Sequence, residues 1–186
     1  FMEMNTRLQV EHTVTEQVYQ VDLVQAQIRV AAGEPLPYRQ EDLVPRGHAI
    51  ECRITAEDPE RNFMPCPGRI EAVRLPSGPG IRDDSAIAPG YTIPMDYDPM
   101  VAKLIAYGPD RQDAIRKMRR ALDEYRLEGI KTNIPYLRRL MEHPVYVAGD
   151  VNTAFIDQYG PELLKGSDPW LDEVAVRSVA AATMRC

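Results

Sequence analysis

The chain has 186 residues, of which 44% are hydrophobic and 27% are charged, a balance typical of globular domains. Its formal net charge of −6 excludes the basic footprint of a nucleic-acid-binding domain. No apolar run reaches the roughly 18 residues of a membrane-spanning helix. The cysteines Cys52, Cys66 and Cys186 are far apart and form no Cys-x-x-Cys pair. The sequence therefore predicts neither a disulfide framework nor a zinc site, and it favours a reducing compartment, the cytoplasm or the mitochondrial matrix.

The first sixteen residues alternate with a period of two, which predicts an extended strand with one mostly apolar and one polar face. The polar face carries Glu3, Asn5, Arg7, Gln9 and Glu11. A simple reading of this pattern is an amphipathic strand with one wet face. The polar residue types also suggest a binding site, because two carboxylates, two amides and a guanidinium stand in one row.

Each polar group in that row has a plausible chemical role. Glu3 and Asn5 offer hard oxygen ligands on neighbouring same-side positions, which suit Mg²⁺ shared with phosphate oxygens and water. Arg7 has a planar fork of donors that suits a small oxyanion such as bicarbonate or phosphate. Glu11 is a candidate general base, held near a cation that keeps it ionised.

Apolar residues at helical spacing predict a helix from Thr13 to the break at Gly33 and Pro35, with Thr13 and Glu16 in capping-box form. A Pro-rich connector follows over 34–48. The next alternating segment, 49–56, predicts a strand that places Ile50, Cys52 and Ile54 on one side and Glu51, Arg53 and Thr55 on the other. On the residues alone, Arg53 would pair with Glu51 or Glu57 on a sheet surface.

After a loop over 57–68, short strands are predicted at 69–75, 81–86 and 100–107, forming an antiparallel meander. Asp98 precedes a proline and is expected to form a turn. Helices are then predicted from Asp110 to the residue before Gly129, from Asn133 to Glu142, and near 153–159. A further Ala-rich helix is expected over 168–186.

Several strings together carry a resemblance to a known family. The chain reads EMNTRLQVEHTVTE at 3–16, GHAIECRITAEDP at 47–59, GYTIPMDYDPMVAKL at 90–104 and EGIKTN at 128–133. These strings closely resemble the signatures of biotin carboxylases, which belong to the ATP-grasp superfamily. The resemblance covers roughly residues 1–160 and fades after Gly160.

The resemblance implies specific roles for residues in the first two strings. Glu3 and Asn5 would bind the Mg²⁺ or Mn²⁺ that bridges the phosphates of ATP. Bicarbonate would be held by Arg7, Gln9 and the backbone of Val10. Glu11 would deprotonate the bicarbonate, and Arg53 would face the ureido oxygen of biotin, where a fixed guanidinium stabilises developing negative charge.

The resemblance also implies an architecture and partners. The fold expected is α+β, with the end of an ATP-grasp unit at 1–33, a biotin carboxylase C-terminal domain at 34–160 and a linker or tail helix at 161–186. The expected activity is ATP-dependent carboxylation of biotin on a carrier protein, with a carboxyltransferase as a further partner. The family's homodimer interface arginine matches Arg82, although its neighbouring aromatic is Pro79 here. The final acceptor, whether acetyl-CoA, propionyl-CoA or pyruvate, is left open.

Because Phe1 begins inside the predicted strand, we expect the chain to be a C-terminal fragment whose upstream part is missing. It contains no glycine-rich phosphate loop, so we expect the isolated chain to bind ATP weakly and to be inactive. A second hypothesis is a non-catalytic module for dimerisation or carrier docking. A third is a different ATP-grasp ligase such as a carbamoyl-phosphate synthetase, which shares the Glu-x-Asn pair but not the rest of the strings.

Overall fold

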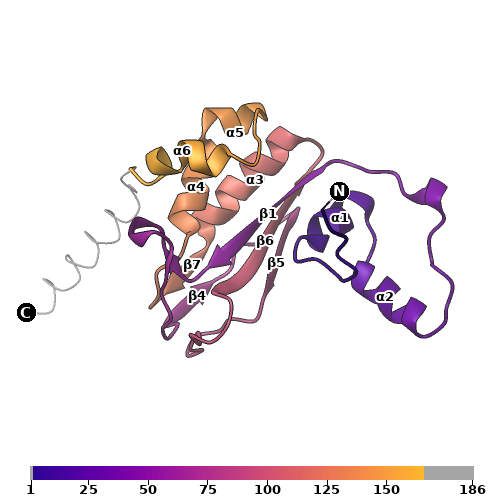
Figure 1. Ribbon diagram of the computed structural model, residues 1–186, viewed down its shortest axis with the longest axis horizontal. Coiled ribbons are helices and arrows are strands. Elements are labelled where there is room, and N and C mark those ends of the chain that lie inside the picture. The colour runs from indigo at the N-terminus through magenta and orange to yellow at the C-terminus, as the bar shows by residue number, and fades with distance from the viewer. Residues whose placement is uncertain (1, 166–186) are drawn as a thin grey trace, which may run out of the picture.

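The structure is a computed structural model that describes residues 2–165. A three-stranded antiparallel sheet stands in the middle, with the helices of the C-terminal half on one face and the first helix on the other (Figure 1). The predicted α+β class is confirmed. The helix expected at 168–186 lies outside the described residues.

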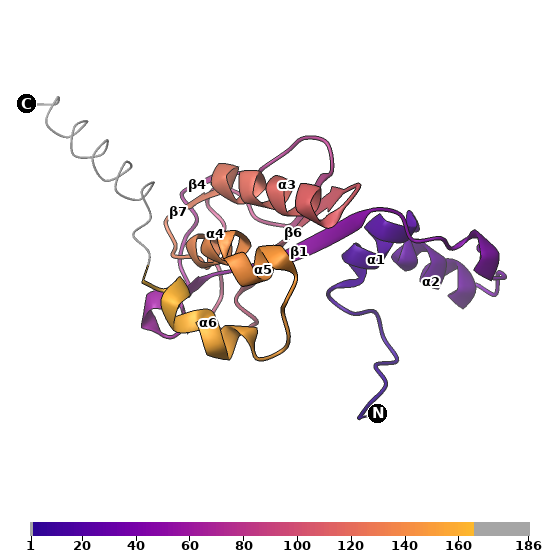
Figure 2. The same cartoon turned by 90° about the horizontal axis from the view of Figure 1, so that it is seen from above.

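Residues 2–10 form no regular secondary structure, so the predicted opening strand is wrong for this chain. The backbone N–H and C=O groups of a strand need a neighbouring strand to pair with. In the described part of the chain, no strand lies beside this segment. The segment extends away from the rest of the molecule in Figure 2. The alternation therefore grouped the polar residues correctly, but it did not establish that they form a strand.

The predicted single N-terminal helix is two helices, α1 (His12–Tyr19) and α2 (Leu23–Ala31). Between them, Gln20 adopts a left-handed conformation with φ of 57°. The side chain of Asp22 then accepts a hydrogen bond from the backbone N–H three residues on, at 2.7 Å, and so begins α2. Aspartate is among the most favourable residues at the N-cap of a helix, so Asp22 starts a second helix inside the segment that was predicted as one.

The connector over 34–47 is mostly exposed and contains one short 3₁₀ turn, η1 (Gln40–Asp42). The backbone N–H of Arg46 donates to the carbonyl of Val18 on α1 at 2.9 Å. At Gly47, which has φ of +66°, an added Cβ would lie 2.4 Å from the carbonyl oxygen of Gly108. Glycine is therefore required where the connector enters the sheet.

The sheet has the order β1 (His48–Thr55), β6 (Met100–Gly108) and β5 (Ile81–Ser85), all antiparallel. These strands confirm the predictions at 49–56, 81–86 and 100–107. The register between β1 and β6 shifts by one residue between Ile54 and Thr55, which marks a bulge.

The predicted meander is wrong, because β4 (Ala72–Arg74) does not join this sheet. It pairs instead with β7 (Arg126–Glu128), which follows α3. Pro76 and Pro79 lack backbone N–H groups, so the chain between β4 and β5 cannot continue the hydrogen-bond ladder of a sheet.

Inside the segment predicted as a loop at 57–68, three short elements form: β2 (Glu57–Asp58), η2 (Pro59–Arg61) and β3 (Met64–Pro65).

Helix α3 (Arg111–Glu124) begins where predicted, since Asp110 accepts a hydrogen bond from the backbone N–H of Asp113 at 2.8 Å. It ends before Tyr125 rather than near Gly129, because β7 occupies the intervening residues. The remaining helices are α4 (Ile134–Glu142), as predicted, α5 (Pro144–Ala148), which was not predicted, and α6 (Phe155–Leu163). The predicted boundary at 160 falls inside α6, and Leu163 is buried in the core.

The main core lies between the sheet and helices α3, α4 and α6. It is built by alternate residues of β1 and β6 and by the apolar stripe of α3. Its members on these elements are Ile50, Cys52, Ile54, Ala102, Leu104, Ala106, Ala114, Ile115, Met118, Ala121 and Leu122. Cys52 is buried in this core, and burial raises the pKa of its thiol to about 12, so this cysteine is a small apolar residue of the core.

Candidate active site

The predicted metal ligands Glu3 and Asn5 and the predicted anion ligand Arg7 all lie on the exposed segment before α1. The guanidinium of Arg7 donates to the carbonyl of the neighbouring Leu8 at 3.3 Å. The three side chains therefore face solvent, where bound groups can reach them.

Glu11 and Arg53, which are 42 residues apart, meet at the end of this segment. Nη2 of Arg53 donates to Oε2 of Glu11 at 2.9 Å. Both side chains remain about half exposed, at 52% for Arg53 and 55% for Glu11. The structure thus brings together the predicted general base and the predicted oxyanion-stabilising group, one from each of the first two family strings.

Glu51 lies beside this pair on the same face of β1. Its side chain is only 6% exposed, and its Oε1 lies 3.9 Å from Nε of Arg53. The hydroxyl of Thr13 on α1 donates to Oε2 of Glu51. The predicted capping box is therefore wrong, because the Thr13 side chain contacts the sheet instead of the start of its own helix.

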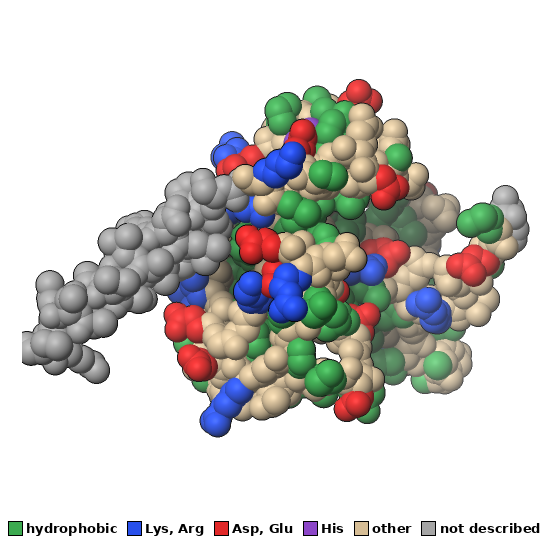
Figure 3. All heavy atoms as spheres, turned by 60° about the vertical axis from the view of Figure 1, so that its left-hand side comes forward, with side chains coloured by type: hydrophobic (Ala, Val, Ile, Leu, Met, Phe, Trp, Pro, Cys, Tyr) green, Lys and Arg blue, Asp and Glu red, His purple; other side chains and the backbone are tan. Residues whose placement is uncertain are grey.

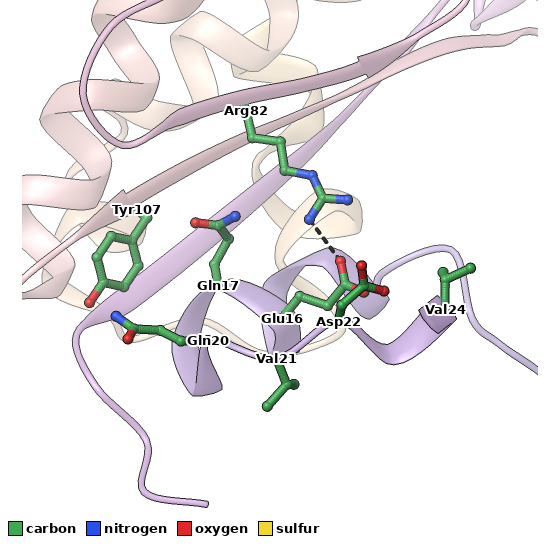
Figure 4. A pocket seen from close by; sticks show the side chains of 8 residues that line it. All are labelled: Glu16, Gln17, Gln20, Val21, Asp22, Val24, Arg82 and Tyr107. Carbon is green, nitrogen blue, oxygen red and sulfur yellow. Dashed lines mark hydrogen bonds and ion pairs between the residues drawn. The ribbon is translucent and has the colours of Figure 1, made fainter. Parts of the chain in front are cut away.

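Arg82 on β5 joins the sheet to α1 (Figure 4). Its Nη1 donates to Oε2 of Glu16 at 2.7 Å, and its Nε and Nη2 each donate to Asp84 at 2.7 Å. Glu16 is 7% exposed and also accepts the backbone N–H of Leu23 at 2.9 Å. These contacts border an open pocket of about 650 Å³ between α1 and the sheet.

Lys103 stands between Arg53 and Asp84 in the register of the three strands. Its Nζ donates to the carbonyl of Val10 at 3.3 Å and lies 3.8 Å from Oδ2 of Asp84. Hydrogen bonds from Arg82 and the nearby charge of Lys103 lower the pKa of Asp84. The polar face of the sheet is therefore a continuous network of charges beside Glu11.

Asn133 fixes the outer edge of β1 at Arg53. Its side-chain amide donates to the carbonyl of Arg53 at 2.9 Å and accepts the backbone N–H of Thr55 at 3.0 Å. The residue is 8% exposed, and although it stands at the start of α4 its side chain does not cap that helix. Sequence reasoning missed the roles of Asn133 and Lys103. The alternation along β6 could have placed Lys103 on the polar face of the sheet. The contact of Asn133 with Arg53 spans 80 residues, so no local pattern in the sequence indicates it.

Arg7, Gln9 and Glu11 also line one side of an open groove of about 820 Å³. Apolar residues of α2 and the connector also line it, together with Leu8. The apolar lining residues are Leu8, Leu23, Ala26, Val30, Ala31 and Leu36. The groove thus combines polar and apolar lining residues, as sites for organic ligands commonly do.

Asp98 accepts the backbone N–H of Met100 at 2.8 Å, which confirms it as a turn former.

Among residues 2–165, no group of three or more His, Cys, Asp or Glu side chains is arranged to hold a metal, and no helix is long and apolar enough to cross a membrane. On the face shown in Figure 3, basic and acidic side chains lie next to one another among apolar ones.

Two family profiles match this chain, each over a different part of it. The profile of the biotin carboxylase C-terminal domain matches residues 51–158, and that of the carbamoyl-phosphate synthase L chain ATP-binding domain matches residues 1–39. Biotin carboxylase 1 of Bacillus subtilis is 54% identical over 159 residues, which are 86% of this chain and 35% of that protein. The chloroplastic biotin carboxylase of Arabidopsis thaliana is 47% identical over 184 residues, which are 99% of this chain and 34% of that protein.

A solved structure gives the same result. The biotin carboxylase domain of the Hydrogenobacter thermophilus 2-oxoglutarate carboxylase, crystallised as a dimer with MgADP, ADP and bicarbonate, superposes with a TM-score of 0.87 at 45% identity. The match covers 90% of this chain and 37% of that one. The chain thus spans about a third of the length of the relatives it matches. With more than half of its residues inside the family profile, the chain belongs to the biotin carboxylase C-terminal domain family.

Proposed function

We propose that this chain supplies the bicarbonate- and biotin-facing part of a biotin carboxylase, whose reaction is the ATP-dependent carboxylation of biotin on a carrier protein. The observation that supports the proposal is the contact between Glu11 and Arg53. An ion pair this exposed contributes at most about 1 kcal/mol to stability. Because the pairing of this carboxylate and guanidinium adds so little to stability, we assign it a role in the chemistry.

In the proposed first step, Glu11 removes the proton from bicarbonate while Arg7 positions the anion. Gln9 and the backbone of Val10 complete the binding site. An oxygen of the deprotonated anion attacks the γ-phosphorus of ATP, the bond to the β-phosphate oxygen breaks, and carboxyphosphate and ADP form. Glu11 suits this role because its carboxylate is half exposed at the end of the segment and can contact a bound anion as well as Arg53.

In the second step, the carboxyl group moves from carboxyphosphate to the ureido nitrogen of biotin, and phosphate leaves. The ureido nitrogen loses its proton to the departing phosphate, so negative charge develops on the ureido oxygen. The guanidinium of Arg53 stabilises that charge. Its backbone is fixed on both sides, by β6 and by Asn133, so the donor is in position before biotin arrives.

Glu3 and Asn5 fit a part of a magnesium or manganese site. One carboxylate and one amide oxygen are the number of protein ligands that Mg²⁺ often takes when nucleotide phosphates and water complete its shell. The metal would neutralise charge on the phosphates of ATP. Both side chains are exposed on an unpaired segment, which leaves them free to adjust to it.

The same proposal includes domain boundaries and partners. Residues 1–33 would end the ATP-grasp unit and 34–160 would form the C-terminal domain. Two profiles, over residues 1–39 and 51–158, support a division into two units. The partners would be a biotinylated carrier protein or domain and a carboxyltransferase. Arg82 would lie at a homodimer interface, with its present contacts to Glu16 and Asp84 retained.

The test uses a hybrid in which residues 1–160 replace the matching segment of Bacillus subtilis biotin carboxylase 1. We expect the hybrid to make carboxybiotin from free biotin, ATP, Mg²⁺ and bicarbonate. Glu11→Gln and Arg53→Ala should each lower turnover at least ~100-fold. Arg39→Ala, which removes an exposed connector arginine paired with Asp42, is the matched control and should leave turnover unchanged. Full activity of both site variants would overturn the assigned roles.

A further inference from the structure

Lys103 has surroundings that neither the family strings nor the proposed chemistry accounts for. It lies in the middle of β6 and its side chain is 16% exposed, although lysine side chains usually reach solvent. Directly opposite Lys103, on β1, is a second cation, Arg53. Directly opposite on β5 is Asp84, so a repulsive pair on one side of Lys103 is set against an attractive pair on the other, and the two cross-strand contributions oppose each other.

The hydrogen bond of Lys103 goes to the active-site segment. Asp84, its nearest carboxylate, is engaged by two hydrogen bonds from Arg82 and lies 3.8 Å from the Lys103 ammonium. The carbonyl of Val10 lies closer, at 3.3 Å, and accepts from Nζ. The contact joins residues 93 apart and ties the segment before α1 to the sheet.

The other hydrogen bonds described for residues 7–10 are local. The carbonyl of Gln9 accepts from the backbone of His12 at 3.3 Å and lies 2.8 Å from Nδ1 of the His12 ring. Arg7 contacts only its neighbour Leu8 by hydrogen bond. These contacts shape the turn into α1. The helix itself is held to the sheet by Thr13 on Glu51 and by Glu16 on Arg82, so the bond from Lys103 acts on the segment that precedes the helix, at the peptide between Val10 and Glu11.

We propose that Lys103 is a positioning residue for bicarbonate: it holds the carbonyl of Val10 and thereby sets Glu11 at a fixed distance from Arg53. The carbonyl of Val10 and the N–H of Glu11 belong to one planar peptide group, so fixing the carbonyl orients the start of Glu11. A compact ammonium with three donors makes this bond from the sheet without entering the groove. The inference rests on the proposed function, because bicarbonate is the ligand that the segment would hold.

The experiment compares three substitutions of Lys103 in the hybrid enzyme. Lys103→Met keeps the length but removes the charge and the donor, Lys103→Gln keeps a donor without the charge, and Lys103→Arg keeps both the charge and donors. We expect Lys103→Met to lower kcat/KM for bicarbonate ~10-fold or more, with the KM for ATP changed less than about twofold. Lys103→Gln should restore part of the loss. Lys103→Arg, which keeps both properties, should restore more of it. A loss of equal size in all three variants would overturn the positioning role.

Lys117→Met is the matched control. Lys117 on α3 also donates to a backbone carbonyl, that of Tyr107 at 3.0 Å, but it pairs with Asp113 and takes no part in the network beside Glu11. An equal rise in the bicarbonate KM for this variant would attribute the effect to lost stability and overturn the inference. Hydrogen exchange gives a readout besides activity: amides of residues 9–12 should exchange faster in Lys103→Met and not in Lys117→Met. Unchanged exchange would overturn the inference even if the hybrid is active, whereas an inactive unmodified hybrid would overturn the proposed function.

Discussion

The two faces of the central sheet use the same three strands for opposite purposes. One face buries Cys52, Leu104 and their neighbours against α3, while the other carries Arg53, Lys103 and Asp84 in one row beside Glu11. Consecutive residues belong to different faces because side chains alternate along a strand. Stability and chemistry can therefore be altered separately by changing adjacent residues.

Asp83 and Asp84 show the difference within one strand. Asp84 is on the polar face, and its hydrogen bonds from Arg82 lower its pKa. Asp83 is on the core side near Tyr125, and desolvation by burial raises its pKa. The same residue type is thus stabilised as an anion on one face and destabilised on the other.

The largest expected effect comes from Leu104→Ala on the core face. Leu104 is fully buried, so the change should lower the free energy of unfolding by about 2–5 kcal/mol through lost burial and a cavity. Arg53→Ala on the polar face should change it by less than about 0.5 kcal/mol. Urea denaturation followed by circular dichroism would measure both. Equal destabilisation by the two changes would contradict the division of roles.

Next is Asn133→Ala at the edge that both faces share. The change leaves the carbonyl of Arg53 and the N–H of Thr55 without their partner, which should cost about 1–3 kcal/mol of the free energy of unfolding. It should also lower biotin carboxylation by the hybrid more than ATP hydrolysis, because Arg53 is displaced. Asn152→Ala, which removes a hydrogen bond to the exposed backbone of Ala154, is the control with no expected effect on activity.

A smaller effect is expected for Arg82→Met on the polar face. Glu16 loses its closest cation, but Arg82 itself is 33% exposed, so solvent screening limits the cost to ~1–2 kcal/mol. The loss should appear locally as faster hydrogen exchange in α1, since Arg82 holds that helix to the sheet. If exchange rises equally in α3, the contact is not specific to the docking of α1.

The smallest effect is the response to acid. As the pH falls, the folded state should first gain a proton at Asp83, whose pKa is raised above 3.8, and this relieves a penalty. Asp84, whose pKa is lowered below 3.8, contributes stability at higher pH that is lost as the pH falls through its folded value. Asp84→Asn should therefore flatten the fall in stability below about pH 4, and Asp83→Asn should not. Urea midpoints measured from about pH 6 to 2.5 would separate them.

The sequence predicted best the features that depend on local periodicity. The strands of the sheet, the inward faces of Ile50, Cys52 and Ile54, and the start of α3 at Asp110 are confirmed. Each follows from an alternation or a cap that a short window contains. The pairing of β4 with β7 was missed because it depends on a partner more than 50 residues away.

For the candidate site, family strings identified Glu11 and Arg53, and the structure brings them into contact. Neither string indicated that Thr13 would bond to Glu51, that Glu16 would bind Arg82, or that Asp22 would begin a second helix. Ser, Thr, Asp and Glu near a helix start can cap that helix or contact a neighbour, and only tertiary structure decides between them. A strand prediction at 3–11 failed for a similar reason, since alternation does not supply a pairing partner.

The bulge between Ile54 and Thr55 bears on how the gene can tolerate length changes. A one-codon insertion or deletion within β1 before Ile54 would exchange the two faces, turning Arg53 toward α3 and a core residue toward Glu11. The same change in the exposed connector over 34–47 would leave the parity of β1 intact. We therefore expect homologous genes to vary in length along the connector, while the number of residues from Gly47 to the bulge stays constant.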